Sequence, residues 1–195
     1  MGHLRPALVL VALFTVLTGL VFPLGFVALG RAVFPFGAGG SLVEHDGRVV
    51  GSALLGQSFT QDRYFHGRPS ATTDTDPGDS SRTVAAPYNA AGSGASNLGP
   101  TSKALVERVA GDLKDAGPVP GPVPGDAVTA SASGLDPDIS PANAERQVAR
   151  VAAARGLRAE QVRVVVAAHT AGRLLGVIGE KRVNVLALNL ALDAP

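Results

Sequence analysis

PALVLVALFTVLTGLVFPLGFVALG, residues 6–30, is a stretch without a charged side chain that lies between Arg5 and Arg31. As an α-helix it would be about 37 Å long, which exceeds the roughly 30 Å of a bilayer's hydrocarbon core. Fifteen of its residues are Leu, Val or Phe, whose transfer into lipid is favourable. A signal peptide has a hydrophobic region of only about 7–15 residues, so the stretch favours an uncleaved anchor, although ALG at residues 28–30 fits a cleavage site. We predict a transmembrane helix over residues 6–30, after a short tail over residues 1–5.

Three residues inside this span, Gly19, Pro23 and Gly25, are features that a lone anchor does not need. Proline disturbs a helix, and small residues let a second helix approach closely, so we expect these positions to contact a partner in the membrane. The basic residues on the two sides of the span are almost balanced, so the positive-inside rule gives little preference. The very short tail favours a cytoplasmic N-terminus and an extracytoplasmic remainder.

The composition of the chain excludes several classes of function. Its 17 Lys and Arg residues face 16 Asp and Glu residues, which leaves no electrostatic footprint for nucleic acid. The absence of cysteine excludes a disulfide framework, a thiolate nucleophile and a cysteine-based metal site. After the span, FPFGAGG at residues 34–40 contains the Gly and Pro residues that break helices. We therefore predict a juxtamembrane hinge over residues 31–42 and one soluble domain over residues 43–195.

The clearest helix of this domain is expected over residues 141–155, with Ser140 as its N-cap and Gly156 as its C-terminal stop. Apolar patterns predict further helices and strands. The expected helices cover residues 101–116 and 159–168, and the expected strands cover residues 49–55 and 174–178. Residues 184–193 fit either a strand or a helix, and we favour the helix. Short mixed elements of this kind indicate a small α+β domain behind the single N-terminal transmembrane helix.

Two segments lack apolar periodicity. Residues 67–101 are dominated by small and polar residues, so composition alone favours disorder over an ordered loop. Residues 117–125 read GPVPGPVPG, and their four prolines predict a semi-rigid extended connector.

The residues of the chain form no complete motif for catalysis or metal binding. The chain has no P-loop pattern and no complete nucleophile elbow. Four serines could serve as nucleophiles only beside a histidine base: the serines are Ser93, Ser96, Ser131 and Ser133, and the histidines are His45, His66 and His169. Asp136 and Asp138 resemble part of a calcium loop, but its terminal Glu is missing, and the segment fits a turn better. The residues thus predict no catalytic site and no metal site.

A series of motifs along the chain is more specific. In order, it contains YF at 64–65, RPSA at 68–71, PYN at 87–89, SGASNLGP at 93–100, VTASASGLDP at 128–137, ISP at 139–141, Gln147, RVA at 150–152, RGL at 155–157 and VNVLALNLALD at 183–193. Behind one N-terminal membrane helix, this series resembles the C subunits of the Kdp-type potassium-transporting ATPases of bacteria. The resemblance covers nearly the whole chain. Ala95, where the family commonly has Gly, and the GPVP connector are its departures.

The resemblance implies an accessory subunit of the bacterial cell membrane that is not itself an enzyme. Its implied partners are a P-type ATPase subunit, which hydrolyses ATP, and a channel-like subunit, which conducts potassium. The family's C subunit is described as a catalytic chaperone that raises the ATP affinity of the P-type subunit. In that description, its nucleotide-binding loop corresponds to Ser93, Gly94, Ala95, Ser96 and Asn97. No stably bound cofactor is implied, and ATP is met through the complex.

The family's soluble domain is also placed outside the cytoplasm, which conflicts with contact to cytoplasmic ATP. The residues favour the outside placement. The resemblance also changes the expectation for residues 67–101 to an ordered surface loop, in which Arg68, Tyr88 and Asn97 fix the path or contact a neighbouring subunit. The alternative is a free-standing, membrane-anchored extracytoplasmic binding module or Ser hydrolase.

Overall fold

The computed structural model describes residues 2–115 and 121–194. The chain divides into two units, residues 1–52 and residues 53–195, and each is described by itself. The second unit therefore begins ten residues after the start that the sequence suggested for the soluble domain.

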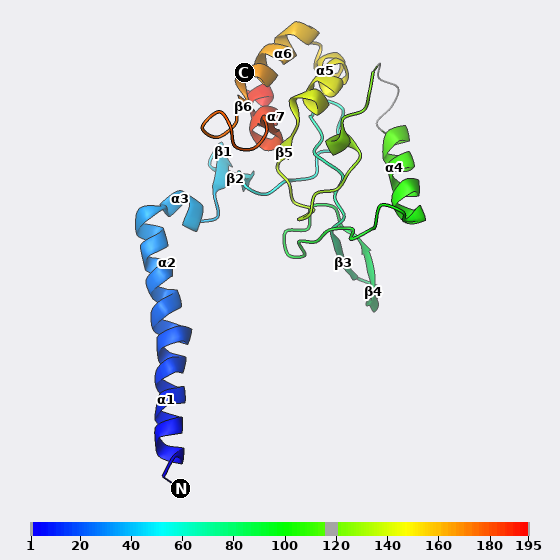
Figure 1. The fold of residues 1–195 in the computed structure, drawn as a ribbon. Coiled ribbons are helices and arrows are strands. Elements are labelled where there is room, and N and C mark those ends of the chain that lie inside the picture. Colours follow the sequence, from blue (N-terminus) through cyan, green and yellow to red (C-terminus); the bar gives the residue numbers. More distant parts are fainter. Residues whose placement is uncertain (1, 116–120, 195) are drawn as a thin grey trace. The chain divides into compact units, whose positions relative to one another are not determined.

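The first unit begins with one continuous apolar helix. It consists of α1 (Leu4–Val16), the single π turn η1 (Leu17–Val21) and α2 (Phe22–Val33). Together these elements form a helix of 30 residues that contains an 18-residue window with a mean hydropathy of 2.5, long and apolar enough to cross a membrane (Figure 1). The helix is longer at both ends than the predicted 6–30.

Pro23 explains the π turn. A proline has no N–H to donate, so the carbonyl of Gly19, four residues earlier, loses its usual helical partner. The N–H of Phe22 donates to the carbonyl of Leu17, five residues earlier, which is the π-helical pattern. The disturbance expected from Pro23 thus takes the form of one widened turn that contains Gly19.

The predicted hinge over 31–42 contains more structure than expected. It includes the end of α2, the short helix α3 (Pro35–Ala38) and the first residue of β1. The strands β1 (Leu42–His45) and β2 (Arg48–Ser52) pair in an antiparallel hairpin. Asp46 and Gly47 form its turn with φ angles of 50° and 72°, the left-handed pair that a type I′ turn requires. The strand expected over 49–55 therefore ends at Ser52.

The second unit contains the helices that the sequence predicted. Figure 1 shows them as α4 (Lys103–Asp115), α5 (Pro141–Arg155), α6 (Ala159–Ala168) and α7 (Val185–Asp193). The hydroxyl oxygen of Ser140 accepts a hydrogen bond from the N–H of Asn143 at 3.0 Å, and Gly156 ends α5 with a φ of 65°. The preferred helix over 184–193 is also correct, with Asn184 as its N-cap.

The strands of this unit are short. β5 (Asp138–Ile139), β7 (Arg182–Asn184) and β6 (Thr170–Ala171) form an antiparallel sheet in the order β5–β7–β6. The strand expected over 174–178 is wrong, because Leu174 and Ile178 instead pair with each other across a tight loop. Mixed helices and short strands behind one apolar helix confirm the α+β class.

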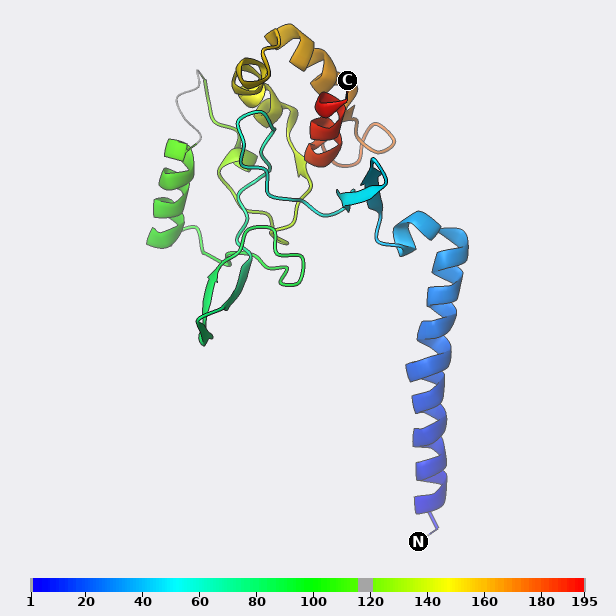
Figure 2. The same cartoon turned by 180° about the vertical axis from the view of Figure 1, so that it is seen from behind.

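The structure describes residues 67–101 throughout, which agrees with the path expected from the resemblance rather than with the composition. They contain an unexpected antiparallel hairpin of β3 (Thr73–Asp76) and β4 (Asp79–Ala85). This hairpin projects from the unit at the end opposite the α5–α7 helices in both views (Figures 1 and 2). Of the predicted connector over 117–125, residues 117–120 lie outside the described residues. The 3₁₀ turn η2 (Gly125–Ala127) begins at the last residue of this predicted connector.

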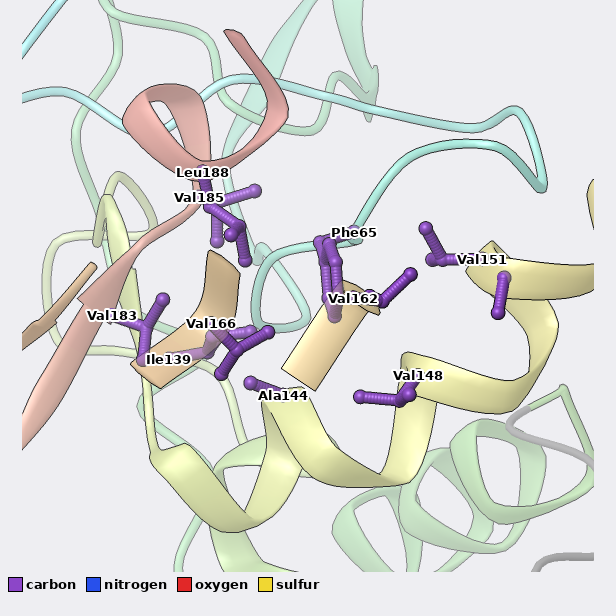
Figure 3. Packing of buried hydrophobic residues seen from close by; sticks show 11 residues of the cluster. Phe65, Ile139, Ala144, Val148, Val151, Val162, Val166, Val183, Val185 and Leu188 are labelled. Atoms are coloured by element: carbon purple, nitrogen blue, oxygen red, sulfur yellow. The ribbon is translucent and has the colours of Figure 1, made fainter. Parts of the chain in front are cut away.

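The core lies where α5, α6 and α7 meet the three-stranded sheet (Figure 3). Phe65, with no exposed surface, inserts from the preceding segment among the valines of α5 and α6. The cluster comprises Phe65, Ile139, Ala144, Val148, Val151, Ala152, Val162, Val166, Val183, Val185 and Leu188. Removal of this apolar surface from water is the main force that holds the helices together.

Candidate functional site

The motif residues Arg68 and Asp136 meet in the folded domain. Nη1 of Arg68 donates to Oδ2 of Asp136 at 2.7 Å, and its Nε and Nη2 each reach the carbonyl of Thr129 at 3.4 Å. About a quarter of each of the two charged side chains is exposed. This charge-assisted pair joins two loops that are 68 residues apart in sequence.

Tyr88 fastens a third loop to the same place. Its hydroxyl donates to the carbonyl of Arg68 at 2.7 Å, and its backbone N–H donates to the hydroxyl of Ser70 at 2.9 Å. A Cβ built on Gly56 would lie 2.5 Å from Cε1 of Tyr88, and one built on Gly67 would collide with its hydroxyl. The ring therefore requires glycine at both positions.

Burial, and secondly the negative charge of Asp136, raise the pKa of Tyr88 to about 12. The phenol is therefore a hydrogen-bond donor at neutral pH. We call Arg68, Tyr88 and Asp136, with the loops that they join, the motif cluster.

The hydroxyls of Ser70 and Thr72 extend the hydrogen bonds of the motif cluster into the domain. Ser70 donates to the carbonyl of Gly134 at 2.7 Å, and Thr72, which is buried, donates to the carbonyl of Ala86 at 2.6 Å. Gly134 has a φ of 67°, and a Cβ there would lie 2.5 Å from Cγ2 of Thr72. The Ser131–Pro141 segment is thus held by backbone and hydroxyl contacts that only a glycine permits.

The predicted nucleotide-binding loop, residues 93–97, lies beside this segment. The hydroxyl of Ser93 and the N–H of Gly94 both donate to the carbonyl of Ser133, at 3.0 and 2.9 Å. Ala95 and Ser96 are half-buried, whereas Asn97 is exposed and has a φ of 52°, a conformation that asparagine tolerates well. In this arrangement two donors that a phosphate would use are engaged by a protein carbonyl.

An open depression of about 780 Å³ lies over these loops. Its charged edge is formed by Arg68 and Asp136, and Leu54, with 65% of its surface exposed, contributes an apolar edge. The rest of the lining consists of Leu55, Leu135 and Pro137 together with small residues near positions 90–93 and 130–133. The depression offers a shaped surface of mixed polarity to a partner.

The candidate bases lie in structural hydrogen bonds. Nε2 of His66 is 3.1 Å from the carbonyl of Gln61, and Nδ1 of His169 is 2.9 Å from the carbonyl of Val165 at the end of α6. Burial, followed by the charge of Arg150, lowers the pKa of His66. His45 belongs to the first unit. Of the candidate nucleophiles, Ser131 and Ser133 lie 3.3 Å apart and accept backbone N–H groups of the same turn.

Within residues 2–115 and 121–194, no group of three or more His, Asp or Glu side chains is placed to hold a metal ion. In the membrane helix, a Cβ on Gly19 or Gly25 would meet nothing within 4 Å, so both positions present open helix surface.

Sequence reasoning missed how the segment before Arg68 is fixed. The buried amide of Asn189 on α7 accepts from the N–H of Phe65 at 2.8 Å and donates to its carbonyl at 3.0 Å. The amide of Gln147 on α5 makes the same two contacts with the backbone of His66, at 2.8 and 3.1 Å. These side chains take the place of a neighbouring strand. The sequence signal for these contacts was a side-chain amide, from Asn189 or Gln147, on a helix face that is otherwise apolar.

The guanidinium of Arg155 completes this attachment. It donates to the carbonyls of Arg63 and Leu192 and to Oδ1 of Asp193. The Asp193 carboxylate also accepts from Arg63 and from the hydroxyl of Tyr64. Partial burial acts to raise the pKa of Asp193, but these hydrogen bonds outweigh it and hold the pKa below its ordinary value.

These features fit a single-pass membrane protein whose α+β domain is organised by a cluster of loop motifs. The sequence pattern of the family described as "KdpC: K+-transporting ATPase, c chain" matches residues 4–194. The chain is 62% identical over 195 residues to a "Potassium-transporting ATPase KdpC subunit" of Rhodopseudomonas palustris (strain BisB18), covering 98% of both chains. It is 63% identical over 193 residues to the protein of that name from Methylobacterium nodulans, covering 98% of this chain and 96% of the relative. The chain therefore belongs to the KdpC family, the c chains of potassium-transporting ATPases.

Proposed function

We propose that this chain is a non-catalytic accessory subunit that assembles with and stabilises the P-type ATPase subunit and the channel-like subunit of a potassium uptake complex. Membership of the family makes it a subunit of such a complex. We further infer what its soluble domain does in that complex. It presents a fixed surface to its partners and supplies no reacting group.

The observation that supports this proposal is that the motif residues make hydrogen bonds and ion pairs within the domain itself. Arg68, Tyr88 and Asp136 bond to one another or to backbone carbonyls, and thereby hold three loops in one arrangement. A reactive site would instead aim such groups at a substrate. Rigid loops under an open depression suit recognition of another protein, because little conformational entropy is lost on binding.

The membrane helix provides the second contact in this proposal. The π turn around Gly19 and the open surface at Gly25 let a neighbouring helix come close to the backbone. Replacement of both glycines by leucine should release the subunit from the complex in detergent, whereas replacement of Leu8 by alanine should not. Full retention of the double variant would remove the span from the interface.

The exposed side chain of Leu54, at the edge of the depression, allows the most specific test of the proposed partner contact. Leu54→Asp places a charge where a partner would bury an apolar side chain, and Val164→Asp makes the same change at an equally exposed position on α6. We expect Leu54→Asp to lower co-purification with the P-type subunit and potassium-limited growth, and Val164→Asp to leave both unchanged. Equal assembly of the two variants would contradict the proposal.

The soluble domain is proposed to lie outside the cytoplasm, with the N-terminus inside. Because the chain has no cysteine, Ser80→Cys and Val164→Cys introduce single thiols at exposed positions. An impermeant thiol reagent should label both in intact cells. Labelling only after lysis would place the domain in the cytoplasm and favour the alternative, in which residues 93–97 bind ATP. Ser93→Ala and Gly94→Ala would then lower the ATP affinity of the assembled complex.

A further inference from the structure

The loop between β6 and β7 carries the two most exposed large aliphatic side chains among the described residues of the second unit, Leu175 and Val177. Every residue from 171 to 182 is exposed. The exposed fractions are 64% for Leu174, 84% for Leu175, 76% for Val177 and 57% for Ile178. Side chains of this kind are normally buried, so their presentation together in one loop calls for a partner. We call residues 174–179 the apolar tip.

The apolar tip has a defined backbone. Leu174 and Ile178 exchange both backbone hydrogen bonds at 2.9 Å, and the N–H groups of Gly176 and Val177 donate within the same turn. Leu175 has a φ of 54°, which is strained for a branched aliphatic residue. Because the N–H groups of Leu174, Gly176, Val177 and Ile178 are already paired, the turn can approach an apolar phase at a lower cost than an open loop would.

The base of the apolar tip is basic. Arg173 pairs with Glu180 across the neck at 2.7 Å, and Lys181 and Arg182 follow. Arg182 also pairs with Asp138 of β5 at 3.1 Å, so three cations stand beside two carboxylates at the base of a tip that itself contains no charge. Aliphatic side chains with flanking Lys and Arg are the arrangement of segments that lie in a membrane interface, where the cations meet anionic headgroups.

Size and tethering separate a lipid surface from a protein partner. A stable protein interface buries about 1,200–2,000 Å² and involves about 20–30 residues on each side, far more than four side chains provide. A bilayer needs only a weak contact, because residues 34–52 connect the domain covalently to the transmembrane helix and so keep its local concentration at the membrane high.

We propose that the apolar tip inserts into the interface of the bilayer that its own helix spans, and that it prefers membranes containing anionic lipid. This goes beyond assembly of the complex. It assigns residues 174–182 a lipid contact that orients the domain relative to the membrane and leaves the depression beside Leu54 for a protein partner.

The test uses the full chain reconstituted without other subunits in vesicles that contain lipids brominated in their acyl chains. A polarity-sensitive fluorophore is attached at Val177→Cys, and a matched control carries it at Val164→Cys, which is similarly exposed but lies on α6. We expect at least threefold stronger quenching at position 177 than at 164. The difference should be larger in vesicles of phosphatidylcholine with phosphatidylglycerol than in phosphatidylcholine alone.

Leu175→Asn supplies the specific variant, because asparagine accepts the left-handed backbone of Leu175 and the loop should keep its shape. Combined with the label at 177, it should reduce quenching to the level of the control. Equal quenching at positions 177 and 164 would overturn the proposal. So would shielding of position 177 that occurs only when the other subunits are added, since this would assign the tip to a protein interface.

Discussion

Asn189 offers a direct measure of how the domain holds its motif-bearing segment. Its amide satisfies the N–H and the carbonyl of Phe65, and both residues are almost fully buried. Asn189→Ala leaves two backbone groups without a partner, and each orphaned buried group costs about 1–3 kcal/mol. The expected loss is therefore about 4 kcal/mol, which is a large part of the roughly 5–15 kcal/mol that stabilise a typical domain.

The assay follows unfolding through tyrosine. The chain has no tryptophan and two tyrosines, Tyr64 and Tyr88, which both lie in the second unit. Tyrosine fluorescence of the full chain in mild detergent thus reports on this unit, while the transmembrane helix stays silent. At about 2–4 °C per kcal/mol for a chain of this size, Asn189→Ala should lower Tm by roughly 8–16 °C. Val164→Ala, on the exposed face of α6, should change Tm by less than about 2 °C.

A second variant separates the two hydrogen bonds. Asn189→Asp keeps an acceptor for the N–H of Phe65, but at neutral pH it cannot donate to the Phe65 carbonyl and it buries a charge. It should therefore destabilise the domain at least as much as the alanine variant. A Tm shift below about 3 °C for Asn189→Ala would refute the reasoning, because Phe65 would then have another source of hydrogen bonds.

Three further perturbations test the electrostatics and packing. Gly67→Ala should displace the Tyr88 hydroxyl from the carbonyl of Arg68 and lower the pKa of Tyr88 from about 12 toward its ordinary value, as seen by ultraviolet titration; an unchanged titration would contradict the packing. The pKa of Asp193 is lowered by folding, so its stabilisation is present above the unfolded value of about 3.9 and is lost as pH falls through the folded pKa. Asp193→Asn should lower Tm at neutral pH and flatten its decline in acid, and parallel curves for variant and parent would argue against it. The pKa of His66 is also lowered, so the unfolded chain takes up a proton first as pH falls below about 6.5, and stability declines there. His66→Gln should remove that decline in a Tm series, whereas its persistence would point to another group.

The helices were predictable because their signals are local. Ser140 and Gly156 bound α5 at the residues that capping chemistry demands, and the apolar period between them is complete. The helix of residues 4–33 needed only a long run without charge. The turn at Asp46 and Gly47 carried an equally local hairpin signal that the sequence interpretation did not use.

The strands were not predictable for a physical reason. β5 and β6 contain two residues each, too few to show alternation, and their pairing with β7 is decided by the packing of helices around them. β4 is exposed along its whole length, so its sequence has no buried face to reveal. Conversely, Leu174–Ile178 has the apolar composition of a buried strand but is exposed on the surface of the domain, which is why it was assigned wrongly.

The candidate site shows where sequence interpretation stops. Arg68 and Asp136 were noticed separately, one as a motif residue and the other as part of a turn, but their ion pair spans 68 positions and exists only in the folded chain. Most of the motif residues discussed here hold loops together from within. The groups left to meet a partner are exposed aliphatic side chains such as Leu54 and Leu175, neither of which belongs to the motif series. For an accessory subunit this division is physically reasonable, because scaffold contacts need specific donors and acceptors, whereas docking to lipid or protein depends mainly on apolar surface.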